Sequence, residues 1–167
     1  MITFIYSPPC LVPLKGGTFF ALILHFVFIV KIRFITDNLG MSYIEYNPNP
    51  VGRKVGDCAV RAISKALKVD WETAYLMIAM NGLQMGDMPS SDSVWGAVLR
   101  QNNFYRKAIP NFCPDCYTAR QFAEDHPAGT FVLGFGGHVA TIVNGNIYDS
   151  WDSSNEIPVY YWYRKDE

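Results

Sequence analysis

Cys58 follows Asp57 in the segment VGDCAVRAISKAL (55–67), where residue types and spacing first indicate chemistry. Small and aliphatic residues repeat there at helical spacing, at Ala59, Ala62, Ile63, Ala66 and Leu67. An amphipathic helix is therefore expected to begin at the cysteine, with Asp57 as its N-cap. A thiol at a helix N-terminus has a lowered pKa, because the unpaired N–H groups and the helix dipole stabilise the thiolate. The competing interpretation is a small cysteine that only packs in the core.

His138 is the histidine best placed to act with this thiol. It opens an expected strand in GFGGHVATIVNG (134–145), whereas His25 lies in the N-terminal segment and His126 at the end of an expected helix. A histidine beside a cysteine serves as its general base or forms a thiolate–imidazolium pair with it. The competing interpretation is a core histidine that is hydrogen-bonded to a neighbour.

Asp149 is the candidate to orient the imidazole. It lies eleven residues after His138, on the far arm of a hairpin that the residues VNGN (143–146) predict. Residues on paired strands near the open end of a hairpin approach one another, so the carboxylate can accept the second ring N–H and fix the tautomer. Asp152 is the alternative acceptor, and its other interpretation is a turn residue.

The periodicity of the remaining chain predicts an α+β fold. The segment 43–54 contains two Asn-Pro steps and is expected to be extended or looped. Further helices are expected over 69–82, with Asp70 as cap and Gly82 as stop, within 88–104, capped by Ser90 or Ser91, and between Thr118 and Pro127. Strands are expected at 129–135, 138–145, 146–151 and 157–163. This order predicts N-terminal helices packed on a C-terminal antiparallel β-sheet.

Residues 1–40 differ from the rest of the chain. An apolar run from Thr18 to Val30 is broken only by His25, and it is shorter than the ~20 residues that span a bilayer. One interpretation is a weak membrane anchor or uncleaved signal in residues 18–35. Another is a buried hairpin or helix of the fold. The favoured one is a hydrophobic extension translated upstream of a natural start at Met41, which leaves 41–167 as a single domain.

The charge and cysteine content of the chain limit the kinds of partner and setting to be expected. The 167 residues carry a net charge of −1 with no basic block, so no electrostatic nucleic-acid footprint is expected. Residues 41–167 contain three cysteines, an odd number, which favours a reduced, cytoplasmic setting over a disulfide scaffold.

The order of these pieces resembles the papain-like cysteine peptidase superfamily. A cysteine opens the first long helix, further helices follow, and a sheet then carries a histidine and later an Asp-Ser-Trp (149–151). The segments GDCAVRA and GGHVATIVNGNIYD are similar to the bacterial branch, which holds double-glycine leader peptidases and small uncharacterised proteins of Firmicutes and their phages. The resemblance covers roughly 43–163. It implies a monomeric thiol protease without a cofactor, in which Cys58, His138 and Asp149 cleave a peptide or isopeptide bond.

One departure from the family pattern concerns the oxyanion. Papain-like enzymes usually carry a glutamine about six residues before the cysteine, and this chain has Gly52 there. Asn49, or else Asn47, is the candidate side-chain donor, although either also fits turn chemistry. The missing glutamine supports the alternative of a weakly active or inactive domain that binds a partner. A transglutaminase-like acyl transfer is a further alternative on the same residues.

The motif CPDC (113–116) contains the other two cysteines of residues 41–167. Cys-x-x-Cys occurs in zinc sites and redox pairs, and His126 could supply a third ligand. No fourth ligand is identified, and the motif lies in a loop before Thr118 rather than at the start of a helix. A structural or incidental role is favoured, so no metal is expected.

Overall fold

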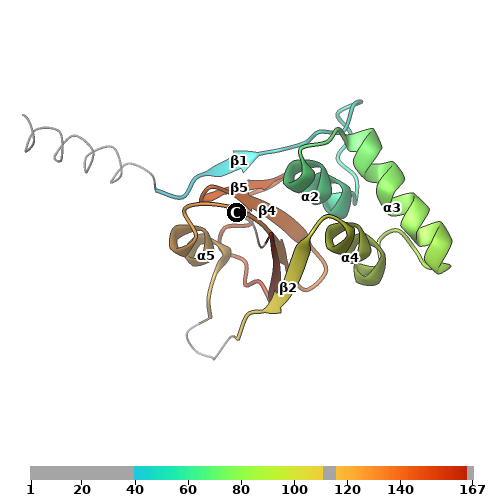
Figure 1. Ribbon diagram of the computed structural model, residues 1–167. Coiled ribbons are helices and arrows are strands. Elements are labelled where there is room, and N and C mark those ends of the chain that lie inside the picture. The colour runs from blue at the N-terminus through green and yellow to red at the C-terminus, as the bar shows by residue number, and fades with distance from the viewer. Residues whose placement is uncertain (1–39, 111–115, 165–167) are drawn as a thin grey trace, which may run out of the picture. The chain divides into compact units, whose positions relative to one another are not determined.

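The computed structural model describes residues 40–110 and 116–164. Its elements, in chain order, are β1 (Tyr43–Glu45), α2 (Cys58–Leu67), α3 (Trp71–Met85), α4 (Asp92–Gln101), β2 (Phe104–Ala108), α5 (Ala119–Asp125), β3 (Thr130–Gly134), β4 (Val139–Val143), β5 (Asn146–Asp149) and β6 (Tyr160–Arg164) (Figure 1). Residues 18–35 and Cys113 lie outside the described residues. In the described part of the chain, no helix has both the length and the apolar character needed to cross a bilayer.

One six-stranded sheet forms the centre of the fold, in the order β1-β5-β4-β3-β6-β2. β1 runs parallel to β5, and the other neighbours are antiparallel. The fold is therefore α+β with a mixed sheet. The expected all-antiparallel, C-terminal sheet is wrong at both edges, because β1 and β2 lie before the C-terminal strands in the chain and β1 runs parallel to β5.

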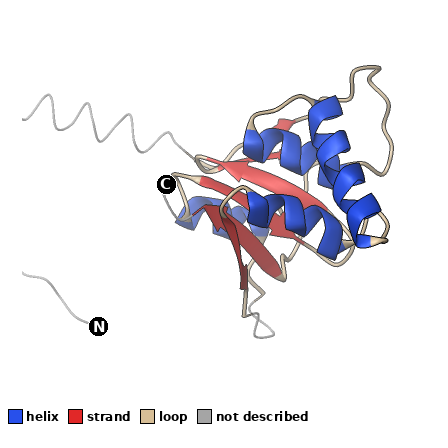
Figure 2. Cartoon of the chain, turned by 45° about the vertical axis from the view of Figure 1, so that its right-hand side comes forward, coloured by secondary structure: helices blue, strands red, loops and turns tan. Residues whose placement is uncertain are grey.

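Helices cover both faces of this sheet. α2, α3 and α4 lie on one face and α5 on the other (Figures 1 and 2). The strand alternation divides the core accordingly: Val132 and Trp162 pack with α2–α4, whereas Leu133 and Ile142 pack with α5. The sheet thus brings the start of α2 against the start of β4, which is where Cys58 and His138 lie.

Helix boundaries follow the expected caps with one correction. The Asp70 carboxylate accepts the Thr73 N–H at 2.6 Å, as an N-cap should. Gly82 does not stop α3, which continues to Met85 and ends at Gly86 in the left-handed conformation. Gly82 is needed inside the helix for a different reason: a Cβ there would lie 2.9 Å from the Asp87 carbonyl oxygen.

The hairpin that carries Asp149 forms as predicted. Asn144 and Gly145 have φ values of 50° and 73°, and positive φ at both central residues is what a two-residue type I′ hairpin turn requires. The pair Val143–Asn146 lies next to the turn, and the pairing of β4 with β5 continues from there. The turn places the end of β5 near the start of β4. Asp149 and His138 therefore meet at the open end of the hairpin.

Gly134→Ala is expected to destabilise the fold by about 1–3 kcal/mol, because overpacking a filled core forces its neighbours to move. A Cβ at Gly134 would overlap the Tyr160 ring, which is buried and tied to Asp92 by a 2.7 Å hydrogen bond. Gly136→Ala is the matched control, since a Cβ there has no neighbour within 4 Å. Urea unfolding measures both variants, and equal midpoints would contradict the packing argument.

Candidate functional site

The N-terminus of α2 presents Cys58 with free backbone donors around it. Asp57 occupies the N-cap position, but its side chain makes no capping hydrogen bond. Its carboxylate instead pairs with Arg61 and accepts the Trp71 Nε1–H at 2.8 Å. The first intrahelical hydrogen bond runs from the Arg61 N–H to the Asp57 carbonyl, so the N–H groups of Cys58 and Ala59 precede it. These groups can receive an oxyanion.

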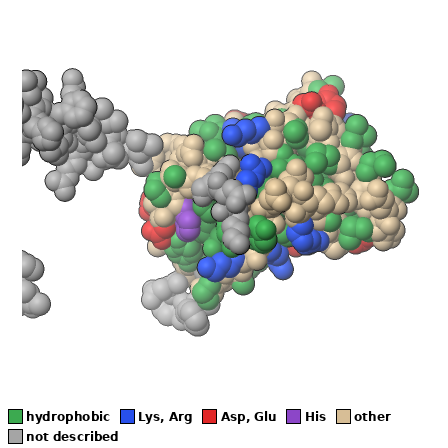
Figure 3. All heavy atoms as spheres, viewed as in Figure 1, with side chains coloured by type: hydrophobic (Ala, Val, Ile, Leu, Met, Phe, Trp, Pro, Cys, Tyr) green, Lys and Arg blue, Asp and Glu red, His purple; other side chains and the backbone are tan. Residues whose placement is uncertain are grey.

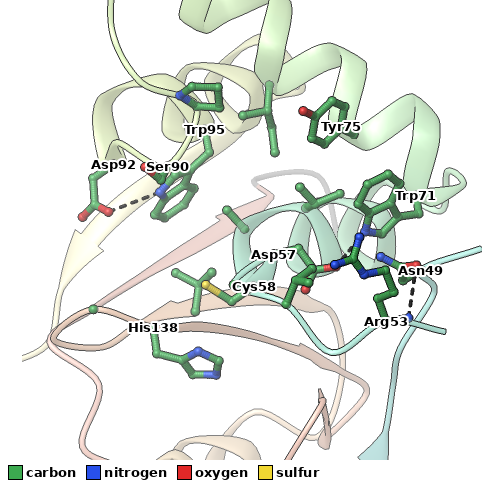
Figure 4. A pocket seen from close by; sticks show the side chains of 18 of the residues that line it. Asn49, Arg53, Asp57, Cys58, Trp71, Tyr75, Ser90, Asp92, Trp95 and His138 are labelled. Carbon is green, nitrogen blue, oxygen red and sulfur yellow. Dashed lines mark hydrogen bonds between the residues drawn. The ribbon is translucent and has the colours of Figure 1, made fainter. Parts of the chain in front are cut away.

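His138 lies between the thiol and Asp149. Its Nε2 is 2.6 Å from Asp149 Oδ2, and its ring is hydrogen-bonded to Cys58. Because Nε2 faces the carboxylate, Nδ1 is the nitrogen left for the thiol. Figure 4 shows the ring below the Cys58 sulfur at the edge of a pocket. The structure therefore brings together the three residues that the sequence pointed to.

Two aromatic rings lie near the imidazole. The Phe135 ring stacks near it with centroids 5.9 Å apart, and the Trp151 ring lies 5.3 Å away at 39°. The His138 side chain is 20% exposed and that of Asp149 1%. The ion pair is thus largely screened from water, which strengthens it.

The loop after β5 orients Asp149. The Ser150 N–H donates to Oδ1 and the Ser153 hydroxyl to Oδ2, each at 2.7 Å. Asp152, the alternative acceptor, instead receives the Ser154 N–H at 3.0 Å and serves as a turn residue. Ser153 was not anticipated, because nothing in the letters DSSNE distinguishes a buried serine from a turn serine.

The electrostatics favour a charged thiol–imidazole pair. Burial raises the pKa of the Cys58 thiol, but the hydrogen bond and charge of His138, the Val139 N–H and the charge of Arg61 bring it below its ordinary value of 9.0. Burial lowers the pKa of His138, and the hydrogen bonds and charges of Asp149 and Cys58 outweigh it and raise the pKa to about 9. Between these two pKa values the site holds a thiolate beside an imidazolium.

A largely apolar pocket of about 500 Å³ opens next to the thiol. Aromatic and aliphatic side chains from three helices line it, among them Val60, Trp71, Tyr75, Ile78 and Trp95. The rings of Trp71 and Tyr75 stack on each other with centroids 5.1 Å apart. A pocket of this size and character suits an organic side chain rather than a small polar ion.

Asn49 lines this pocket but is not beside the thiol. Its Oδ1 accepts the N–H groups of Val51 and Arg53 at 3.1 and 3.3 Å, so it folds its own loop. Figure 4 places it next to Trp71 and Arg53, across Asp57 from Cys58. Asn47 is likewise used locally, and its Oδ1 accepts the Asn49 N–H at 3.3 Å. The structure thus assigns turn chemistry to both asparagines.

Of the CPDC motif the structure describes only Cys116, so the cysteine pair itself lies outside the described residues. Within 40–110 and 116–164, no group of three or more His, Cys, Asp or Glu side chains converges. His126 stacks on Phe122 with centroids 4.0 Å apart, and its Nδ1 lies 2.8 Å from the Phe122 carbonyl oxygen. It therefore ends α5 as a C-terminal residue of the helix.

Asp57→Ala is expected to cost about 3–5 kcal/mol of folding free energy, because it leaves the buried Arg61 guanidinium without its carboxylate. Asp70→Ala is the matched control. It removes an N-cap aspartate that is exposed, so it should cost much less folding free energy than Asp57→Ala. Thermal or urea unfolding compares the two, and equal losses would show that the Asp57–Arg61 pair does not stabilise the start of α2.

Comparison with known proteins finds no match for this chain among family models, curated proteins or solved structures. Its function is therefore inferred from the geometry of the site and from the motifs of the sequence.

Proposed function

We propose that this protein is a thiol-dependent hydrolase that cleaves peptide or isopeptide bonds. The single observation that carries the proposal is the series of contacts from the Cys58 thiol through the His138 ring to the Asp149 carboxylate, at the edge of an apolar pocket. A buried carboxylate on one ring nitrogen and a thiol on the other is the arrangement that activates a cysteine nucleophile.

The mechanism follows from these positions. The Cys58 thiolate attacks the substrate carbonyl carbon, and the Cys58 backbone N–H donates to the oxyanion that forms. The His138 imidazolium then gives its proton to the departing amine, which leaves an acyl-enzyme thioester. Neutral His138 takes a proton from a water molecule, which attacks the thioester and releases the carboxylic acid. Asp149 holds the ring in place through both steps.

Partners and location belong to the same proposal. Lys and Arg side chains are scattered over the face that Figure 3 shows, separated by apolar and neutral groups, which supports a peptide or protein substrate rather than a nucleic acid. We further propose a monomer that acts in the cytoplasm without a cofactor. Membrane association through residues 18–35 is the alternative for its location.

Cleavage of a complex peptide mixture tests this function. The purified chain is incubated with a chymotryptic digest of a cell extract, whose peptides keep internal lysine and arginine residues, and new peptide termini are identified by mass spectrometry. We expect new termini with the native chain and none with Cys58→Ser, which keeps the shape of the side chain but not the thiolate. Identical products from the two proteins, or no products from either, would overturn the proposal.

A further inference from the structure

Asp92 is held in a fixed orientation at one end of the pocket beside the thiol. It is the first residue of α4 and is exposed. Its Oδ1 accepts the Trp95 Nε1–H at 3.2 Å, and its Oδ2 accepts the Tyr160 hydroxyl at 2.7 Å. Both donors belong to buried residues, so the carboxylate is preorganised, and Asp92 lies at the margin of the pocket next to the Trp95 ring (Figure 4).

This carboxylate is the acidic group of the pocket that a ligand can reach. The other one, Asp57, is buried and already paired with Arg61. Among the described residues Asp92 forms no ion pair. Arg106 lies nearby, but its guanidinium lies over the Tyr160 ring, 3.8 Å from the ring centroid, rather than against the carboxylate. Arg53 lines the pocket at its opposite end (Figure 4). A cation on a ligand would therefore be attracted to the Asp92 end.

The apolar lining of this pocket suits a long aliphatic stem. Val60, Ile78 and Trp95 are nearly fully buried in the fold and supply apolar surface without hydrogen-bonding demands, since the Trp95 N–H is already used. Lysine and arginine side chains lie along such surfaces with the charged group at a polar edge. Trp95 can add a cation–π contact to the charged end.

We propose that the pocket binds a lysine or arginine side chain of the substrate, with Asp92 as the residue that determines this specificity. The inference rests on the proposed function and names the substrate class for the same thiol. A glycine would leave a pocket of about 500 Å³ empty, so the geometry points away from a double-glycine substrate.

Two matched affinity reagents test the inference. Tosyl-lysyl chloromethyl ketone and its norleucyl analogue alkylate an active-site cysteine and differ only in the ammonium group. The rate at which each modifies Cys58 is followed by intact mass and peptide mapping at pH 7. We expect the lysyl reagent to react about tenfold faster or more, because a charge-assisted hydrogen bond contributes on that scale. Equal rates with the native chain would overturn the inference.

The variants assign the preference to one residue. Asp92→Asn is expected to bring the lysyl-to-norleucyl ratio close to one. Glu72→Gln, an exposed acid on α3 outside the pocket, should keep the ratio of the native chain. An unchanged ratio in Asp92→Asn overturns the assignment, and the comparison of reagents on the native chain stands even if that variant folds poorly.

A third reagent separates failure of this inference from failure of the proposed function. Iodoacetamide carries no side chain, so its rate at pH 6 reports the thiolate alone. A fast iodoacetamide reaction without a lysyl preference overturns the specificity and keeps the hydrolase. An iodoacetamide reaction no faster than that of glutathione overturns the hydrolase, and the specificity with it.

Discussion

His138→Ala is expected to slow the alkylation of Cys58 by iodoacetamide at pH 6 by about ten- to a hundredfold. The substitution removes the hydrogen bond and charge that lower the pKa of the thiol, and leaves the burial that raises it. A thiol with its ordinary pKa of 9.0 is only about 0.1% thiolate at pH 6. A thiolate of lower pKa is also less nucleophilic, with a Brønsted coefficient of about 0.4–0.5, so the rate falls less than the thiolate fraction does.

The control for this variant is His126→Ala. His126 lies at the end of α5, packed on Phe122, and has no contact with the thiol in its hydrogen bonds or ring contacts. Alkylation is assigned to Cys58 by peptide mapping, since the chain contains three other cysteines. The difference between His138→Ala and the native chain should narrow as the pH rises past 9. Equal rates at pH 6 would show that the thiol and the imidazole do not act as a pair.

Asp149→Asn is expected to lower the pKa of His138 by about one to two pH units, so that the imidazolium is lost at a lower pH. The amide keeps an acceptor for the ring N–H but carries no charge, and a hydrogen bond to a charged group is stronger by an amount on this scale. Burial lowers the pKa of His138 and Asp149 is the largest cause that raises it, so the pKa falls from about 9 in the variant. Titration of the His138 ring protons by NMR measures the change directly.

The rate of peptide hydrolysis should also begin to fall at a lower pH in this variant, because the His138 imidazolium protonates the leaving amine. The pH dependence of stability provides a second measurement. A histidine whose folded pKa lies above its unfolded value of about 6.5 contributes stability that is complete below pH 6.5 and lost as the pH rises through about 9. Asp149→Asn should flatten this decline, whereas the exposed neighbour Asp152→Asn should leave both curves as they are.

The candidate site could be predicted from the sequence because each of its residues has a local signal. Cys58 opens a helix whose apolar positions repeat every three to four residues, and Asp149 is tied to His138 by a short hairpin with an Asn-Gly turn. Turn chemistry and periodicity therefore place Cys58 at the start of its helix and Asp149 beside His138. They do not pair Cys58 with His138, which lie 80 positions apart, and that expectation came from the order of the motifs and the family resemblance.

The features that escaped prediction depend on contacts between distant parts of the chain. β1 has only three residues, and its place in the sheet is set by pairing with β5. β2 was not predicted, because only Phe104 of it fell in an expected element, the helix within 88–104. Asn103, with φ at 63°, turns the chain before Phe104. Asp57 has the residue type of a cap, but its carboxylate pairs with the buried Arg61 one helical turn later and accepts the N–H of Trp71, which lies 14 residues away on the next helix.

The pairing of β1 with β5 has a consequence for the order in which the protein gains its reactivity. It pairs residues 104 positions apart, from Tyr43 with Ile147 to Glu45 with Asp149, and the Tyr46 N–H donates to the Asp149 carbonyl at 2.7 Å. Contacts between such distant residues close large loops and form late in folding. During synthesis, Cys58 leaves the ribosome long before His138 and Asp149 do. We therefore expect the thiol of the growing chain to be an ordinary one, and to become a nucleophile only when the last strands complete the sheet.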